Sequence, residues 1–235
     1  PSSFDISSDG TLMVVTNYYQ DRMYGFTMST PFDSSTISLT QTHITSAVEN
    51  SSYQFTNVRN HFEKPYGCRF NGDGTSITII DGYSSTNNKM VSIPLVVPYD
   101  IRGLADGCLN TKTEGLDYPM NVRFSSDGKK VQVLDGSDDR IYQWALHTPF
   151  VLGRGSMTAV YEGYSDLLRT GDGTPIGFDW TPDGKGLFVA GLANDTINYY
   201  DVSTPFDATS TVTYRETIDI TYIETYPYTV RVVNC

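Results

Sequence analysis

The chain has 235 residues and a formal net charge of −11, with 18% charged and 13% aromatic residues. An acidic chain without a Lys or Arg cluster repels phosphate backbones and anionic membrane surfaces, so nucleic acid is not expected as a partner. No stretch approaches the roughly 20 apolar residues that a transmembrane helix needs, and membrane insertion is not expected either. The remainder is rich in Ser, Thr, Asn and Gly, which favours strands joined by many turns.

One spacing pattern runs through the chain four times. Each copy begins with a proline, carries an Asp-Gly pair eight residues later, and has a second proline 22 to 25 residues after the Asp. An aromatic residue follows each second proline, at Phe32, Tyr99, Phe150 and Phe206. A recurrence of this length indicates repeated supersecondary units. The first prolines are Pro1, Pro65, Pro119 and Pro175, the Asp-Gly pairs are Asp9-Gly10, Asp73-Gly74, Asp127-Gly128 and Asp183-Gly184, and the second prolines are Pro31, Pro98, Pro149 and Pro205.

Each copy predicts four short strands. In the third copy, 130–134 alternates polar and apolar residues at the period of a strand, and Asp127-Gly128 before it forms a tight turn. Proline then ends the third strand because it cannot donate to a ladder. In chain order the expected strands are 4–7, 12–16, 23–28 and 37–41 in the first copy, 120–125, 130–134, 140–146 and 157–161 in the third, and 178–181, 186–190, 196–202 and 212–214 in the fourth.

The phase of these landmarks predicts an all-β fold, a β-propeller of four-stranded antiparallel blades in a single domain. The repeats span 1–64, 65–118, 119–174 and 175–226. A β-sandwich is the main rival, and it gives no reason for turn, strand and proline to recur in fixed phase.

The end of the chain starts the pattern again. Residues 227–235 repeat the first strand, with Pro227 and Arg231 in the places of Pro65 and Arg69. The start of the chain is also a first strand, so the two ends cannot complete one blade together. Because an unpaired strand is a template for another chain, we expect segment 227–235 to join a neighbouring chain or a further segment.

The ends of the third strands carry a family resemblance. The motif Ser-Thr-Pro-Phe-Asp at 29–33 and 203–207, with Ser-Asp-Gly at 8–10 and Pro-Asp-Gly at 182–184, resembles a β-propeller repeat of bacteriophage virion and tail proteins and of secreted bacterial proteins. The second and third copies depart from it, with Val97 before the proline and Val151 after the aromatic residue.

The resemblance implies an extracellular or virion-surface propeller that serves structure, assembly or adhesion. It implies no catalytic residue and no cofactor. The motif residues build the blade: Asp-Gly forms the turn, proline ends the strand, and the aromatic residue is expected to pack between blades.

Catalytic and metal-binding signatures are not found in the sequence. His43, His61 and His147 lack ligand spacing, and no Gly-x-Ser-x-Gly elbow or phosphate-binding loop occurs. Asp135, Asp138 and Asp139 could offer oxygen ligands to Ca²⁺, but their spacing favours a solvated turn. No metal site and no enzymatic activity are therefore expected, and a propeller hydrolase or lactonase is the weakest alternative.

A recognition surface would lie where the loops between second and third strands emerge together with the loops between blades. Aromatic rings with Asn and Asp suit carbohydrate, because sugar faces stack on rings and hydroxyl groups need fixed donors and acceptors. Cell-surface glycan is thus an alternative partner. The candidate residues are Tyr18, Tyr19, Asp21, Tyr83, Asn88, Asp138, Arg140 and Asn194.

Two covalent modifications are consistent with the sequence. Cys68 and Cys108 fall within one repeat and could form a disulfide, which would leave Cys235 unpaired. Asn50 and Asn194 begin glycosylation sequons, which matter only on a eukaryotic secretory route.

Overall fold

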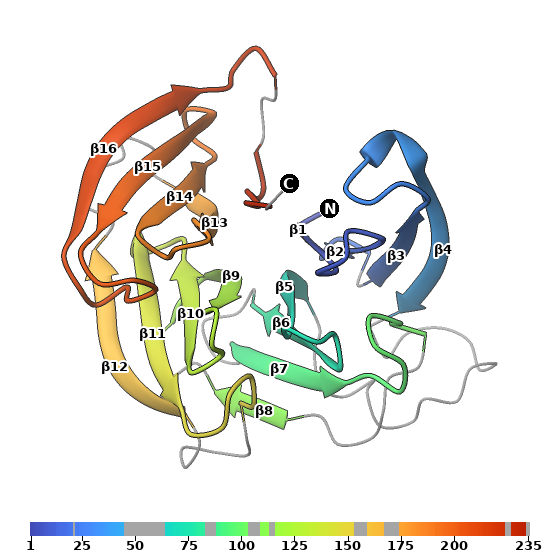
Figure 1. The fold of residues 1–235 in the computed structure, drawn as a ribbon. Coiled ribbons are helices and arrows are strands. Elements are labelled where there is room, and N and C mark those ends of the chain that lie inside the picture. The colour runs from blue at the N-terminus through green and yellow to red at the C-terminus, as the bar shows by residue number, and fades with distance from the viewer. Residues whose placement is uncertain are drawn as a thin grey trace.

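A computed structural model describes residues 1–20, 22–44, 64–82, 88–102, 109–112, 116–152, 159–166, 174–223 and 227–233. Four antiparallel sheets of four strands form a propeller with four blades, and in each sheet the strands pair in chain order. Figure 1 shows the first strand of each sheet nearest the central axis, with both chain ends close to that axis. This architecture confirms the predicted fold class. No helix among the described residues is long and apolar enough to cross a membrane.

The strand bounds follow the repeat. The first blade contains β1 (Ser3–Ile6), β2 (Leu12–Asn17), β3 (Arg22–Met28) and β4 (Ile37–Ile44), and the second contains β5 (Pro65–Phe70), β6 (Ser76–Asp81), β7 (Lys89–Pro94) and β8 (Leu109–Lys112). The third blade contains β9 (Pro119–Phe124), β10 (Lys130–Asp135), β11 (Arg140–Leu146) and β12 (Ala159–Asp166). The fourth contains β13 (Pro175–Trp180), β14 (Gly186–Gly191), β15 (Thr196–Val202) and β16 (Val212–Asp219). A short 3₁₀ turn, Ser34–Thr36, follows the first Pro-aromatic pair.

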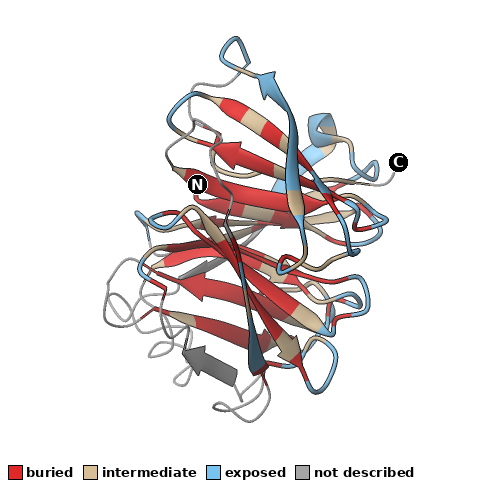
Figure 2. Ribbon diagram, turned by 90° about the vertical axis from the view of Figure 1, so that its left-hand side faces the viewer, coloured by how far each residue is buried: buried red, intermediate tan, exposed pale blue. Residues whose placement is uncertain are grey.

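The fourth strands are longer than the sequence predicted. Strand β16 extends to Asp219 rather than residue 214, and nearly all of its residues are exposed. A strand at the rim has neither face buried, so its sequence lacks the alternation that reveals a strand. Figure 2 shows this contrast, with buried inner strands and exposed turns and rim.

The hydrophobic core lies between neighbouring blades. One apolar cluster joins Val14 and Met23 of the first blade to Ile77 and Ile79 of the second, and another joins Leu134 of the third blade to residues of the fourth. The inner strands β9 and β13 are buried at every position, because a sheet covers each face. Blade stacking therefore supplies most of the apolar burial that stabilises the fold.

The Asp-Gly turns are built alike in the four blades. Asp9 Oδ1 accepts hydrogen bonds from the Ser7 hydroxyl (2.6 Å) and the Thr11 backbone N–H (3.0 Å). Gly10 has a φ of 73°, a conformation that side chains disfavour. Hydrogen bonds from neighbouring hydroxyl and backbone groups lower the pKa of Asp9, which keeps the turn acceptor ionised.

The aromatic residue after each second proline covers the turn of its own blade. Phe150 has a φ of 61°, donates its N–H to Gly128 O (2.8 Å), and its ring lies where a side chain on Gly128 would project. The expected packing between blades is only part of the role of this aromatic residue. It is seen at Tyr99, whose hydroxyl lies 2.9 Å from the Ser8 hydroxyl of the preceding blade. The proline-aromatic motif therefore fastens the outer part of a blade to its inner hairpin.

The last described segment, 227–233, forms no β-ladder within the described chain, although the sequence predicted a first strand there. It lies near the axis, as Figure 1 shows, and its residues Thr229 and Val230 contact Gly177 of β13. A strand assignment requires paired backbone groups, and none of the described residues offers them to this segment. We call residues 227–233 the C-terminal segment.

Candidate functional site

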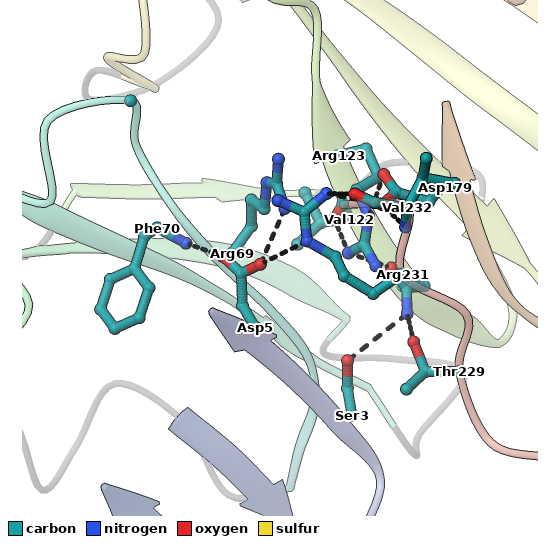
Figure 3. Close-up of polar contacts among 12 residues, drawn as sticks. Ser3, Asp5, Arg69, Phe70, Val122, Arg123, Asp179, Thr229, Arg231 and Val232 are labelled. Atoms are coloured by element: carbon teal, nitrogen blue, oxygen red, sulfur yellow. Dashed lines mark hydrogen bonds and ion pairs between the residues drawn. The ribbon is translucent and has the colours of Figure 1, made fainter. Parts of the chain in front are cut away.

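Five charged side chains meet at the centre of the propeller. Each is the fourth residue after the first proline of a repeat, so the five inner segments carry them to the axis at one level. Figure 3 shows them as one connected network. The residues are Asp5, Arg69, Arg123, Asp179 and Arg231, and we call them the central network.

Asp5 joins the first blade to the second and to the C-terminal segment. Its Oδ1 accepts from Arg69 Nη1 (2.7 Å) and from Arg231 Nε (3.1 Å). Its Oδ2 accepts from the backbone N–H of Phe70 (2.8 Å). The side chain of Asp5 is only 1% exposed, so these three donors replace its hydration.

Asp179 plays the same part in the fourth blade. Its Oδ1 accepts from Arg123 Nε (2.9 Å), and its Oδ2 accepts from Arg231 Nη1 (2.6 Å) and from the Val232 N–H (2.8 Å). Burial opposes ionisation of Asp179, but the charges of Arg123 and Arg231 outweigh it and lower its pKa. Charge-assisted hydrogen bonds of this length are among the strong ones in proteins.

Arg123 is the most deeply buried member of the central network. Its guanidinium also donates to Asn121 Oδ1 (2.7 Å), Val122 O (2.8 Å) and Val230 O (3.1 Å). Burial lowers its pKa, and the adjacent positive charge of Arg69 adds to the effect. Every nitrogen of this guanidinium is hydrogen-bonded, so Arg123 is a structural cation that ties β9 to β13 and to the C-terminal segment.

The C-terminal segment occupies the place of an inner strand. Val232 N–H donates to Asp179 as Phe70 N–H donates to Asp5, and both donors are the fifth residue after a repeat proline. A Cβ added to Gly177 would lie 2.5 Å from Thr229 Cα, and one added to Gly67 would lie 2.6 Å from Asn121 Cα. The segment therefore packs on β13 much as β9 packs on β5.

The candidate ligand-face residues differ in their exposure and in their contacts. Tyr18 stacks on the buried Tyr66 with ring centroids 4.6 Å apart, and Tyr19 beside it is 72% exposed. Asn88 is buried and donates to Leu116 O (2.8 Å), which is a structural contact.

In the third blade Arg140 lies over the Tyr164 ring at 4.3 Å, and Asp138 accepts from the Tyr142 hydroxyl at 2.7 Å. Asn194 is exposed in the turn between β14 and β15. Asp21 and Tyr83 lie outside the described residues. The structure thus brings Tyr18 and Tyr19 together, and Asp138 and Arg140 together.

The buried carboxylate in the acidic loop of the third blade is held by backbone hydrogen bonds. Asp135 is fully buried and accepts from the backbone N–H groups of Tyr118 (2.9 Å) and Ser137 (2.9 Å). Within the described chain, no three His, Cys, Asp or Glu side chains gather as a metal centre. The Asp135 contacts are those of a turn that anchors the start of β9.

Of the residues predicted for a disulfide or for glycosylation, the structure describes Cys68 and Asn194. Cys68 is a free, fully buried thiol whose pKa burial raises to about 12. Its predicted partner Cys108 and the sequon residue Asn50 lie outside the described residues, as does His61.

Sequence reasoning missed the central network, although a signal for it was present. The five charged residues stand at one position of the repeat, between apolar or small neighbours where an inner strand should be buried. Charges at a buried position require partners, and those partners could only come from the same position of other repeats.

Comparisons with known proteins agree on the fold. No protein-family model matches the sequence, and no similar sequence was found among curated proteins. A solved structure of a Lactobacillus plantarum protein aligns over 93% of this chain with a TM-score of 0.55 and 16% identity, and this chain covers 57% of it. A periplasmic gluconolactonase of Pseudomonas aeruginosa aligns over 94% of this chain and 57% of its own, with a TM-score of 0.53 and 16% identity.

A functionally unknown protein from Desulfotomaculum acetoxidans is similar over 91% of this chain and 68% of its own, with a TM-score of 0.53 and 15% identity. This chain therefore spans little more than half the length of the first two structures. Identities this low establish similarity of fold, and the chain has a propeller fold like theirs.

Proposed function

We propose that the protein is a non-enzymatic structural module of an extracellular or virion-surface assembly, joined to a neighbouring copy through its C-terminal segment. One observation carries the proposal: the segment lies in the place of an inner strand while its outward backbone edge has no partner within the described chain. The surface setting comes from the repeat resemblance.

The open edge can be located by comparison with the first blade. There Ser3 pairs with Thr16, Asp5 pairs with Val14, and the Ser7 N–H donates to Leu12 O at 2.8 Å. Thr229, Arg231 and Val233 hold these three repeat positions in the C-terminal segment. Their backbone groups face the place of a second strand, and an unpaired edge of this kind favours pairing with another chain.

The chemistry at the centre supports a role without catalysis. Each carboxylate of the central network already accepts from two guanidinium groups and one backbone N–H. Neither carboxylate is placed to act as a general base, because its oxygens hold the blades together. The lactonase alternative rests on similarity of fold, to the Pseudomonas aeruginosa enzyme and to two putative 6-phosphogluconolactonases of Bacteroides species, at identities of 14–16%.

Blocking the open edge is expected to prevent assembly. The Val233→Pro variant loses the outward N–H, whereas Val233→Thr keeps it with a side chain that suits a strand. Sedimentation across a concentration series should show association for the parent protein and Val233→Thr, and a 26.1 kDa monomer for Val233→Pro. A parent protein that stays monomeric throughout, or a proline variant that still associates, would contradict the proposal.

Carbohydrate binding is the second candidate function, and the Tyr18, Tyr19 and Tyr66 rings favour it. Tyr19 is the exposed end of this stack, and stacking on a sugar face would bury its ring. Tyr19→Ala should abolish binding on a glycan array. The control Tyr222→Ala removes a different exposed tyrosine, which is 82% exposed, and should leave binding unchanged. Absence of binding by the parent protein removes this candidate.

A further inference from the structure

A pocket opens at the axis on the side of the Asp-Gly turns. Its volume is about 350 Å³, within the usual range for small-molecule sites. The ends of the inner strands and the aromatic rings after the second prolines form its walls, and Arg69 and Arg231 lie among its lining residues. The pocket is lined by residues that precede β2, such as Ser7 and Ser8, whereas Tyr18 and Tyr19 follow β2. The two sites therefore lie at opposite ends of the blades.

The centre beneath this pocket carries excess positive charge. The central network holds three guanidinium groups and two carboxylates, in a chain whose net charge is −11. Around the axis, each member of the central network has two neighbours within the network, which makes five pairs. Four of these pairs are ion pairs, and the fifth, Arg69 with Arg123, places two cations on the adjacent inner strands β5 and β9. Low dielectric at a partly buried site strengthens the attraction of such a centre for an anion.

Two of the three guanidinium groups keep donors for a ligand. Among the described residues, Arg69 makes its one hydrogen bond from Nη1, to Asp5. Arg231 donates from Nε and Nη1, and none of the described residues accepts from its Nη2. A guanidinium carries five N–H donors, and these two side chains are 19% and 18% exposed.

We propose that this pocket binds the oxyanion of a small acid, a carboxylate or a phosphate, held by the guanidinium groups of Arg69 and Arg231. A planar guanidinium presents paired N–H groups that match two oxygens of either anion. The anion would neutralise the excess charge, and the aromatic and hydroxyl-bearing walls would surround the rest of the molecule. The pocket shares Arg231 and Val233 with the C-terminal segment, but it uses the guanidinium of Arg231, whereas the open edge consists of backbone groups.

The test is an NMR titration of the full chain with inorganic phosphate and, separately, with acetate, at constant ionic strength. Saturable shifts are expected at the Nε–Hε signals of Arg69 and Arg231 but not of the exposed Arg102 and Arg215, with a dissociation constant on the order of 1 mM. Shifts with phosphate alone or with acetate alone would identify the type of acid, and saturation by neither anion overturns the proposal.

A matched pair of variants tests the role of Arg69. Arg69→Gln should weaken binding about tenfold or more, since it loses a charge-assisted contact, while Asp5 retains Arg231 and the Phe70 N–H. Arg102→Gln, on the surface, should bind as the parent does. Unchanged affinity in Arg69→Gln would overturn the assignment. If that variant does not fold, Arg69→Lys, which keeps the charge but loses the paired donors, replaces it with the same expectation.

Discussion

The Asp179→Asn variant is expected to lose about 3–5 kcal/mol of unfolding free energy, the usual cost of removing one partner from a buried ion pair. The side chain of Arg123 is only 1% exposed, and the change removes the one carboxylate that pairs with it in the described part of the chain. Asparagine keeps the shape and one acceptor oxygen, so the loss reports the missing charge together with the second acceptor oxygen, since both oxygens of Asp179 accept hydrogen bonds. Urea unfolding followed by circular dichroism measures it, with the slope of the transition checked for change.

Two further variants make this prediction specific. Arg215→Met breaks an ion pair with Asp201 in which both side chains are more than half exposed, and about 0–1 kcal/mol is expected. The double change Arg123→Met with Asp179→Leu removes both members of this ion pair, and it should recover part of the stability lost by Asp179→Asn. The recovery is partial because Arg231 and the Val232 N–H still lose Asp179 as an acceptor. A small effect of Asp179→Asn, equal to that of Arg215→Met, would mean that the centre is hydrated and that the central network does not hold the blades.

The Gly67→Ala variant is expected to lose about 3 kcal/mol, at the upper end of the usual cost of overpacking. Its new methyl group would lie 2.6 Å from Asn121 Cα and 2.8 Å from Met120 O, both backbone atoms of a fully buried strand. Since β9 is held by a sheet on its outer side, it cannot move away without disturbing the third blade. The same unfolding measurement applies.

Gly72→Ala is the matched control for this prediction. A Cβ at Gly72 would meet only the Phe150 ring, at an ordinary 3.5 Å, so little change in stability is expected. Gly177→Ala should be intermediate, because its methyl group would meet Thr229 Cα in a segment that pairs with no strand among the described residues. Equal stability of Gly67→Ala and Gly72→Ala would show that the inner strands are not packed this closely.

The fold could be predicted because its landmarks are local. An Asp-Gly turn is specified by two adjacent residues, and the strand that follows it is short and bounded by turn residues on both sides. Strands β11 and β15 accordingly have the predicted bounds. The rim strands were predicted too short since they are exposed on both faces, as the pattern of β16 shows.

The central network is harder to predict because its partners are distant in sequence. Arg231 bonds to Asp5, at the other end of the chain, and to Asp179 in the fourth repeat. Each residue alone is consistent with a solvated strand end. Only the shared repeat position, combined with the requirement that buried charges be paired, would have predicted that they meet.

Hydrogen exchange of the backbone amides tests whether the C-terminal segment occupies the place of an inner strand. At a concentration where the protein is monomeric, the Val232 amide, bonded to Asp179, should exchange slowly, whereas the Thr229, Arg231 and Val233 amides should exchange rapidly. On assembly the latter three should become protected. Rapid exchange at Val232, or equal exchange at all four amides in both states, would contradict an inner-strand position with an open outward edge.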